Sequence, residues 1–354
     1  MDILYVAAGT TAGLIRGDDS LLRALDTCDV NVRYAIPSYS LPRRFRRLVY
    51  RSLVTIDIHQ CLALWTVTSR AVRSERPRSI IYASSHAAML QPPANRASAV
   101  AIRFDTPAQL SRQGRMFAHE HWLERRRFQE ARMLLPWGSE VVPDVAMVLP
   151  PATPAVPLPI PIDQPPELRH DREPFAITYA GSPAKKGLDL VIRAWSKAAI
   201  GERTLMIAGI DGASGRRFLR ERGIDEPRTV EWLGLIPPSD FRALTRRAEL
   251  YIAASRYENY GIAQLEALAD GALLVTLPSA GPYAAMSLNR RLAPALVAPT
   301  FSVVALVDAL ESALRLGAVE RDAYRTRASE MLRAHSQEHL EDLVRSRVLP
   351  ALLG

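Results

Sequence analysis

The stretch SRYENYGIAQLEALADG, residues 255–271, decides how the second half of this chain folds. The apolar run ELYIAA precedes it and ALLVTLP follows it, and short runs of this kind are typical of buried strands. Within the stretch, Ile262, Leu265 and Ala269 form an apolar stripe at helical spacing. Strand, loop, helix and strand in this order predict a crossover unit of a parallel sheet.

Two glutamates make this stretch chemically interesting. Glu258 follows the first strand, in a loop where Gly261 permits backbone conformations that other residues resist. We expect a helix to begin near Gly261, and the free amides and positive dipole of a helix N-terminus suit a phosphate group. Glu266, about one turn inside this helix, is placed to accept hydrogen bonds from hydroxyl groups of the same ligand. Taken alone, both glutamates fit equally well as solvated surface acids.

A second turn with similar properties occurs in YAGSPAKKGLDL, residues 179–190. A predicted strand ends at Ala180, a Gly-Ser-Pro turn follows, and Lys185 and Lys186 precede a predicted helix that begins near Gly187. Cations and free backbone amides at one point favour an anionic ligand. The order of residues is not that of a Walker loop, and an exposed basic helix start remains the alternative.

The rest of the chain alternates strand-like and helix-like runs. In the first half, strands are expected at 2–8, 30–36, 79–85 and 97–105, with helices at 18–28 and 119–133. In the second half, strands are expected at 175–181, 204–209 and 229–234, with helices at 187–195 and 238–248. This alternation predicts a doubly wound α/β domain in each half. The segment 7–19, which contains Gly13, reads as a strand-to-helix turn without the dinucleotide-binding glycine pattern.

Length and composition support two soluble globular domains. The chain has 354 residues, which is longer than most single cores, and the proline-rich segment 142–174 is the natural junction. Its two cysteines, Cys28 and Cys61, have no metal-binding spacing and indicate a reduced cytoplasmic protein. No apolar run reaches the roughly 20 residues that span a bilayer.

The net charge of +8 comes almost wholly from arginine. The arginines are spread over both halves without a recognised nucleic-acid motif, so a nucleic-acid partner is disfavoured. The densest stretch, LPRRFRRLVYR from Leu41 to Arg51, has the pattern of a basic amphipathic surface segment. Contact of Arg43–Arg51 with an anionic membrane surface and an ordinary solvated face are both consistent with this pattern.

Taken together, these motifs resemble glycosyltransferase family 4. The spacing of Glu258 and Glu266 fits E-x7-E, and YIAASRYENYGIAQLEALADGALLV is similar to the donor-site signature of these retaining enzymes. YAGSPAKKGLDLVIRAW, LMIAG followed by VEWLG, and LERRRFQEARMLLPWGSEV resemble further elements of the family. The resemblance implies the GT-B fold, with two facing Rossmann-like domains and a cleft between them.

The fold implied by the resemblance divides the chain into three parts. Residues 1–165 would form an acceptor-side domain, 166–332 the nucleotide-sugar domain, and 333–354 a helix that returns to the first domain. The activity implied is transfer of a sugar from a nucleotide-diphosphate sugar to an acceptor hydroxyl, with retention at the anomeric carbon. The acceptor could be lipid-linked, a polysaccharide or a small molecule. A cytoplasmic site, at the inner face of the membrane if the arginine-rich segment binds lipid, is expected.

The resemblance also assigns roles to residues. Glu258 would meet the donor sugar, Lys186 would neutralise the diphosphate, and Glu266 would accept from the ribose hydroxyls. Further donor contacts are implied at Gly13, Gly181, Ser182, Lys185, Trp232, Leu233, Gly234, Asn259, Tyr260, Gly261 and Ile262. UDP or GDP is the expected nucleotide. No metal ligand or other cofactor is implied, since no D-x-D or His/Cys cluster is evident.

Two departures from the family pattern bear on these roles. Ser182 stands near the place where the family usually has arginine. Lys185 is the nearby cation that could substitute for that arginine, but a lysine does not reproduce the bidentate guanidinium fork. In the first domain, Asp105 after AIRF is the candidate acceptor-side contact, while the sequence does not place His86 or His119 at the site. A nucleotide-sugar-binding protein without turnover is therefore the alternative function.

Overall fold

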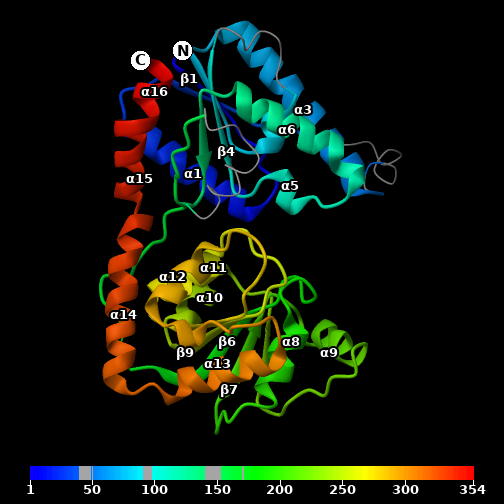
Figure 1. Ribbon diagram of the computed structural model, residues 1–354, viewed down its shortest axis with the longest axis vertical. Helices are drawn as coiled ribbons and strands as arrows, with labels where there is room; N and C mark the ends of the chain where they lie inside the picture. The colour runs from blue at the N-terminus through cyan, green and yellow to red at the C-terminus, as the bar shows by residue number, and fades with distance from the viewer. Residues whose placement is uncertain (40–48, 50, 91–97, 140–152, 170) are drawn as a thin grey trace. The chain divides into compact units, whose positions relative to one another are not determined.

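The computed structural model describes residues 1–39, 49, 51–90, 98–139, 153–169 and 171–354 (Figure 1). These residues form two compact units. The first unit combines Met1–Pro161 with His335–Gly354, and the second consists of Ile162–Ala334. Each unit contains one five-stranded sheet.

The sheet of the first unit is parallel, in the order β2-β1-β3-β4-β5. Its strands are β1 Ile3–Val6, β2 Val32–Ala35, β3 Ser79–Tyr82, β4 Ala99–Phe104 and β5 Met133–Pro136. The strands β1, β3 and β5 are buried at every position, which explains their continuous apolar sequences.

Helices cover both faces of this sheet (Figure 1). Ile3 and Tyr5 point to one face and pack with helix α1 Ala12–Asp26 and the C-terminal segment. Leu4 and Val6 point to the other face, which is covered by α3 Leu53–Glu75, α4 Ser85–Met89 and α6 Ala118–Glu130. The short helices α5 Ala108–Ser111 and η2 Arg115–Phe117 lie between β4 and α6 in the chain.

The C-terminal segment belongs to the first unit. It begins at His335, the last residue of η5 Arg333–His335, and continues through α15 Gln337–Leu343, the π-helical turn η6 Val344–Val348 and α16 Leu349–Leu353. Leu340, Val344 and Val348 are fully buried in the same cluster as Ile3 and Tyr5 of β1. The last twenty residues therefore complete the core of a domain that begins at residue 1.

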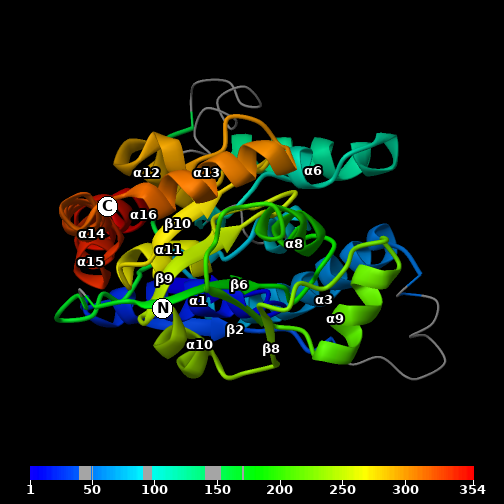
Figure 2. The same cartoon turned by 90° about the horizontal axis from the view of Figure 1, so that it is seen from below.

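The second unit is also a parallel sheet, in the order β10-β9-β6-β7-β8. Its strands are β6 Glu173–Tyr179, β7 Thr204–Ala208, β8 Val230–Gly234, β9 Ala248–Ala253 and β10 Leu273–Thr276. Its helices are α8 Leu188–Trp195, α9 Gly212–Arg220, α10 Pro238–Thr245, α11 Ile262–Ala269, α12 Ala284–Leu292, η4 Pro294–Leu296, α13 Val303–Arg315 and α14 Ala318–Leu332. Helices α8 and α13 pack side by side (Figure 2).

The predicted fold class, two Rossmann-like doubly wound domains, is confirmed. Several boundaries differ from the prediction. Helix α1 begins at Ala12, not at Asp18, because the Thr11 hydroxyl caps it by accepting from the Leu14 amide. Gly13 thus lies in the first turn of α1 and not in a strand-to-helix turn. Helix α6 ends at Glu130, and Met133 already belongs to β5.

Two further sequence expectations concern surface and membrane. In the basic segment, Arg43, Arg44, Arg46 and Arg47 lie outside the described residues. Among the residues that are described, no helix combines the length and the apolar character that crossing a bilayer requires.

Candidate functional site

The candidate site lies at the carboxyl ends of β6 and β9, which are neighbours at the centre of the second sheet. The β6–α8 loop carries Lys185 and Lys186, and the β9–α11 loop carries Glu258. A small cavity at this edge is lined by Tyr179, Lys186, Ser255 and Gln264, among others. Ligands of doubly wound sheets bind at this kind of edge.

Lys186 and Glu258 form the centre of the site. The Lys186 ammonium nitrogen lies 2.6 Å from Oε2 of Glu258, and both side chains are mostly buried. The same oxygen accepts hydrogen bonds from the Ser255 hydroxyl at 3.0 Å and from the Gln264 amide at 3.3 Å. Three donors on one carboxylate oxygen hold Glu258 in a fixed orientation.

Glycine is required at the start of both helices of the site. Gly187 precedes α8 with φ +66°, and a Cβ there would overlap the carbonyl oxygen of Ala254. Gly261 precedes α11 with φ +84°, and a Cβ there would lie 2.5 Å from the Tyr283 ring. At both positions the backbone of the helix start packs against a neighbouring residue so closely that no side chain fits.

The start of α11 has free amides, whereas at the start of α8 the amides of Lys186, Gly187 and Leu188 donate to the carbonyls of Ser182, Ala184 and Pro183. Among the described residues, no side chain caps the first turn of α8 or of α11. The dipoles of the two helices place partial positive charge at Gly187 and at Gly261, beside the Lys186 ammonium group. This combination of amides, dipoles and a cation suits a diphosphate.

The two loops are tied to each other. The Arg256 amide donates to the carbonyl of Lys185, and the Arg256 guanidinium forms a bidentate pair with Asp189 on α8 at 2.7 and 3.0 Å. The Glu258 amide donates to the carbonyl of Ala280 at 2.9 Å. The loop that carries Glu258 is therefore held from both sides, which preorganises the site.

Glu266 has a partner that the sequence did not indicate. It lies in α11, mostly buried, and its Oε1 accepts from Arg242 of α10 at 3.3 Å. Arg242 also makes two 2.7 Å hydrogen bonds to the fully buried carboxylate of Asp270. Arg242 thus fixes Glu266 beside the helix start.

The remaining sequence-predicted donor residues of this unit lie around the same edge. Gly181 adjoins Gly209, since a Cβ at Gly209 would be 2.7 Å from the Gly181 nitrogen. The Gly209 amide donates to the carbonyl of Gly234, so the ends of β6, β7 and β8 meet here. Ser182 and Lys185 are exposed, Asn259 and Ile262 are half-buried, and Tyr260 is buried.

Trp232 and Leu233 lie on β8, which is the outermost strand next to β7. The Trp232 indole nitrogen donates to Glu226 at 2.6 Å, and the ring packs against Gly215. Gly13 and Asp105 belong to the first unit, where the Asp105 carboxylate accepts from the Thr106 amide at 2.8 Å. The structure therefore gathers the predicted residues of the second unit at one edge and keeps these two in the other unit.

Sequence reasoning missed the residues that orient the two glutamates: Ser255, Gln264 and Arg242. Ser255 and Gln264 lie within the quoted stretch, but neither residue type at these positions signals a contact with Glu258. Arg242 is one of many arginines in the chain, and only the packing of α10 on α11 identifies it.

Comparison with known proteins relates this part of the chain to a known family. Residues 160–331 match the family described as glycosyl transferases group 1. No curated protein sequence matches the chain. Among solved structures, sucrose-phosphate synthase from Thermosynechococcus elongatus is similar with a TM-score of 0.74 at 14% identity, covering 99% of this chain and 98% of that one.

Two further structures show the same fold. The Anabaena protein HepE in complex with UDP-glucose has a TM-score of 0.72 at 11% identity, covering 98% of this chain and 99% of that chain. WaaG, a glycosyltransferase involved in lipopolysaccharide biosynthesis, has a TM-score of 0.68 at 14% identity, covering 98% of this chain and all of that one. The chain thus has the GT-B fold along its length, and its residues 160–331 match the glycosyl transferases group 1 family.

Proposed function

We propose that this protein transfers a sugar from a nucleotide-diphosphate sugar to an acceptor hydroxyl, with retention of configuration and without a metal ion at the diphosphate. The observation that carries the proposal is the contact of Lys186 with Glu258 between the starts of α8 and α11. A fixed carboxylate for a polyhydroxylated sugar, next to a cation and free amides for a diphosphate, matches both halves of such a donor.

The chemistry follows from where charge develops. When the bond between the anomeric carbon and the diphosphate breaks, negative charge grows on the leaving diphosphate. Lys186 and the amides at the start of α11 stabilise that charge, and such preorganised groups are usually the largest catalytic contribution. The acceptor hydroxyl attacks on the face that the diphosphate leaves, and a diphosphate oxygen takes its proton, so no separate protein base is needed.

The donor is most simply a UDP or GDP sugar. Glu266, held by Arg242, accepts hydrogen bonds from the ribose, and the backbone near Trp232–Gly234 contacts the base. The structure of HepE with UDP-glucose supports a uridine donor, since it has the same fold. Gly13 and Asp105 would approach donor and acceptor from the first unit.

A nucleotide-sugar-binding protein without turnover is the second candidate. The exposed Ser182, where the family usually has arginine, favours it, because the diphosphate then loses one bidentate partner. Hydrolysis of the bound donor separates the two functions: slow release of free sugar supports an enzyme, and a stable complex supports a binding protein.

The first experiment is a thermal-shift panel of UDP, GDP, ADP and TDP. A ligand at a hundred times its dissociation constant adds about 2.7 kcal/mol to the free energy of unfolding. We expect one nucleotide to stabilise the wild type, and Glu266→Gln to weaken that effect. Glu221→Gln, which changes an exposed acid at the end of α9, is the matched control. A panel without any shift would contradict the donor site.

A further inference from the structure

A cluster of titratable side chains in the first unit has no part in the proposed sugar transfer. Asp57 on α3, His86 on α4 and Glu120 on α6 each offer one ligand atom, and these atoms all lie within 4.8 Å of one another. His86 Nε2 is 3.7 Å from Oδ1 of Asp57 and 4.0 Å from Oε2 of Glu120. The three helices cover the same face of the sheet, so residues far apart in sequence converge here.

In the described part of the chain, Glu120 is buried without hydrogen-bond partners for its carboxylate. It is 3% exposed, and among the described residues neither of its carboxylate oxygens has a hydrogen-bond partner. His86 Nε2 is likewise buried without one. A buried polar group without a partner costs about 1–3 kcal/mol, and more when it is charged. Oε2 of Glu120 and Nε2 of His86, both without a partner among the described residues, lie 4.0 Å apart and next to the carboxylate of Asp57, and this arrangement indicates a missing cation.

The charges around the cluster lead to the same conclusion. Arg112 donates to both oxygens of Asp57, at 2.9 and 3.2 Å, and neutralises that carboxylate. Each carboxylate oxygen has a second lone pair, so Arg112 can orient Asp57 while a metal binds it. His119 lies 3.8 Å from the other oxygen of Glu120 and is half exposed. A cation bound by the cluster would balance the charge of Glu120.

We propose that Asp57, His86 and Glu120 bind a Zn²⁺ ion. An imidazole with two carboxylates suits zinc, whereas Mg²⁺ and Ca²⁺ prefer oxygen ligands alone. Ligand atoms of a tetrahedral zinc site at about 2.0–2.1 Å from the metal lie about 3.4 Å apart. The 3.7 and 4.0 Å separations are close to this value, and small side-chain movements would close the site.

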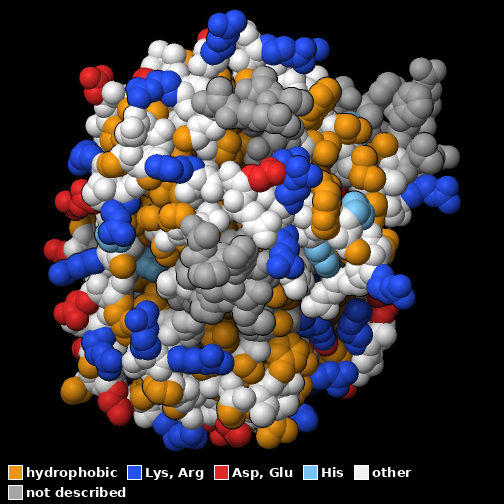
Figure 3. Space-filling model, turned by 45° about the horizontal axis from the view of Figure 1, so that its top comes forward, with side chains coloured by type: hydrophobic (Ala, Val, Ile, Leu, Met, Phe, Trp, Pro, Cys, Tyr) orange, Lys and Arg blue, Asp and Glu red, His pale blue; other side chains and the backbone are white. Residues whose placement is uncertain are grey.

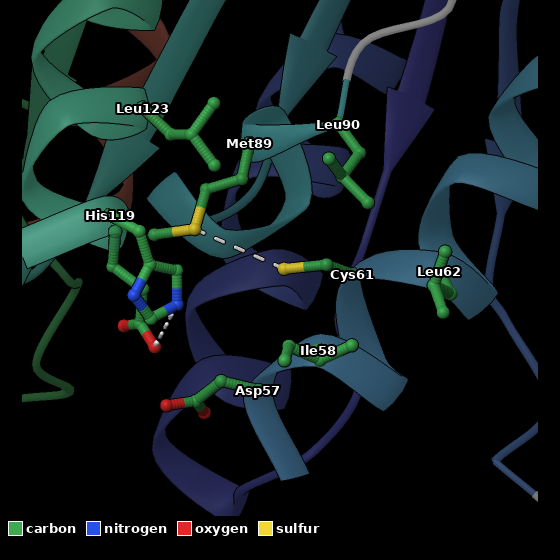
Figure 4. A pocket seen from close by; sticks show the side chains of 9 residues that line it. Asp57, Ile58, Cys61, Leu62, Met89, Leu90, His119 and Leu123 are labelled. Atoms are coloured by element: carbon green, nitrogen blue, oxygen red, sulfur yellow. Dashed lines mark hydrogen bonds and ion pairs between the residues drawn. The ribbon is translucent and has the colours of Figure 1, made fainter. Parts of the chain in front are cut away.

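The surroundings leave one coordination position for a ligand from outside. A cavity of about 180 Å³ adjoins the cluster and is lined mainly by apolar side chains, including Leu62, Met89 and Leu123 (Figure 4). Cys61, one helical turn after Asp57, lies on the wall of this cavity, with its thiol 3.9 Å from the sulfur of Met89. Three protein ligands with an open fourth position are the pattern of a zinc site that binds water or substrate.

The proposal goes beyond the proposed function and does not depend on it. It departs from the sequence-based expectation of no metal ligand, because the three ligands have no recognisable spacing along the chain. The zinc ion would lie in the first unit, whereas the diphosphate seat lies in the second.

The test is zinc binding by the full-length chain after treatment with a chelator. We expect one equivalent of Zn²⁺ to bind at micromolar or tighter affinity, measured by competition with a chromogenic chelator. Cobalt(II) at the same site should give the intense visible absorption of a low-symmetry site. Loss of an outer-shell partner weakens metal binding about 10–100-fold, so loss of a ligand in Glu120→Gln or His86→Gln should exceed about 100-fold.

Two controls keep the result interpretable. His339→Gln, on α15, removes a histidine far from the cluster in sequence and should leave the affinity unchanged. Glu120→Gln should fold at least as well as the metal-free wild type, because it removes an unpartnered buried carboxylate; far-ultraviolet circular dichroism checks this. Failure of the wild type to bind micromolar zinc, or equally tight binding by both folded ligand variants, would overturn the proposal.

Discussion

At the scale of single residues, Lys186 carries the sharpest prediction. Lys186→Ala removes the cation beside Glu258, and we expect kcat to fall about 100- to 1000-fold, the usual cost of losing one preorganised transition-state donor. KM should change less, because the amides at the start of α11 still hold the diphosphate. Lys197→Ala, an exposed lysine after α8, is the control and should keep full activity. A loss below about tenfold would remove Lys186 from the mechanism.

A buried acid in the first unit predicts a pH-dependent stability. Burial raises the pKa of Glu124 to about 7, although both of its oxygens accept from the Ala108 amide, at 2.9 and 2.7 Å. The native state therefore holds a proton that the unfolded chain has already lost between about pH 4.5 and 7. The contribution of this group is fully present below about pH 4.5, and about 3 kcal/mol is lost as the pH rises through 7.

Glu124→Gln tests this prediction because glutamine stays neutral at every pH. The free energy of unfolding of the variant, relative to wild type, should rise by up to about 3 kcal/mol between pH 4.5 and 8. Denaturant titrations of both proteins at four pH values measure that difference. Parallel curves for the two proteins would show that Glu124 keeps an ordinary pKa.

At the scale of the elements, the site depends on where α8 and α11 begin. Gly187→Ala should cost about 1–2 kcal/mol for the left-handed backbone and about 1–3 kcal/mol for the overlap with Ala254. Gly223 has a similar φ of +60° but open space around it, so Gly223→Ala pays only the first cost. The difference between the two melting temperatures isolates the overlap. Equal losses would mean that the β6–α8 loop adjusts without strain.

The same elements show what could be predicted from the sequence. The sequence predicts helix starts at Gly187 and Gly261, because a strand, a glycine and an apolar stripe follow one another along the chain. Such local patterns can be recognised without knowledge of the fold. The sequence predicts a start of α1 that is six residues too late, because Gly13 and Gly17 read as a turn. The helix begins at Ala12, because the Thr11 side chain caps it there. Helix α3, 23 residues long, is not predicted from the sequence. Its buried positions include the polar residues Asp57, Thr68 and Ser69, so the sequence shows only a weak amphipathic pattern.

Contacts between elements could not be predicted. The partner of Glu266 is Arg242, 24 residues earlier, and only the packing of α10 against α11 selects it from the other arginines. The proposed zinc ligands likewise depend on how α3, α4 and α6 share one face of a sheet. Charged residues carry little periodic signal, so their partners follow from the tertiary structure and not from the pattern.

At the scale of the whole molecule, the distribution of cationic side chains among the described residues bears on the partner. On the face in Figure 3, lysine and arginine side chains are scattered among apolar and acidic ones. Many arginines of the described residues also pair with acids, as Arg203 does with Glu249 and Arg247 with Glu173. A net charge of +8 is thus compatible with a nucleotide-sugar enzyme and does not require a polyanionic partner.

One unit is built from a single continuous segment of the chain and the other from two separate segments, and this difference predicts how fragments fold. The second unit is one continuous segment, Ile162–Ala334, with its own sheet. The first unit needs both ends of the chain, because Leu340, Val344 and Val348 are fully buried against β1 and its neighbours. Removing one such side chain costs about 2–5 kcal/mol, and a whole domain has only about 5–15 kcal/mol of stability.

We therefore expect fragment 162–334 to fold alone, with a cooperative melting transition, and to bind the nucleotide that stabilises the full chain. Fragment 1–161 should fail to fold, and joining 335–354 to it through a flexible linker should restore cooperative melting. The matched control joins the same linker to a segment in which Leu340, Val344 and Val348 are serine. A stable fragment 1–161, or equal rescue by the control, would show that the C-terminal segment only covers a core that forms without it.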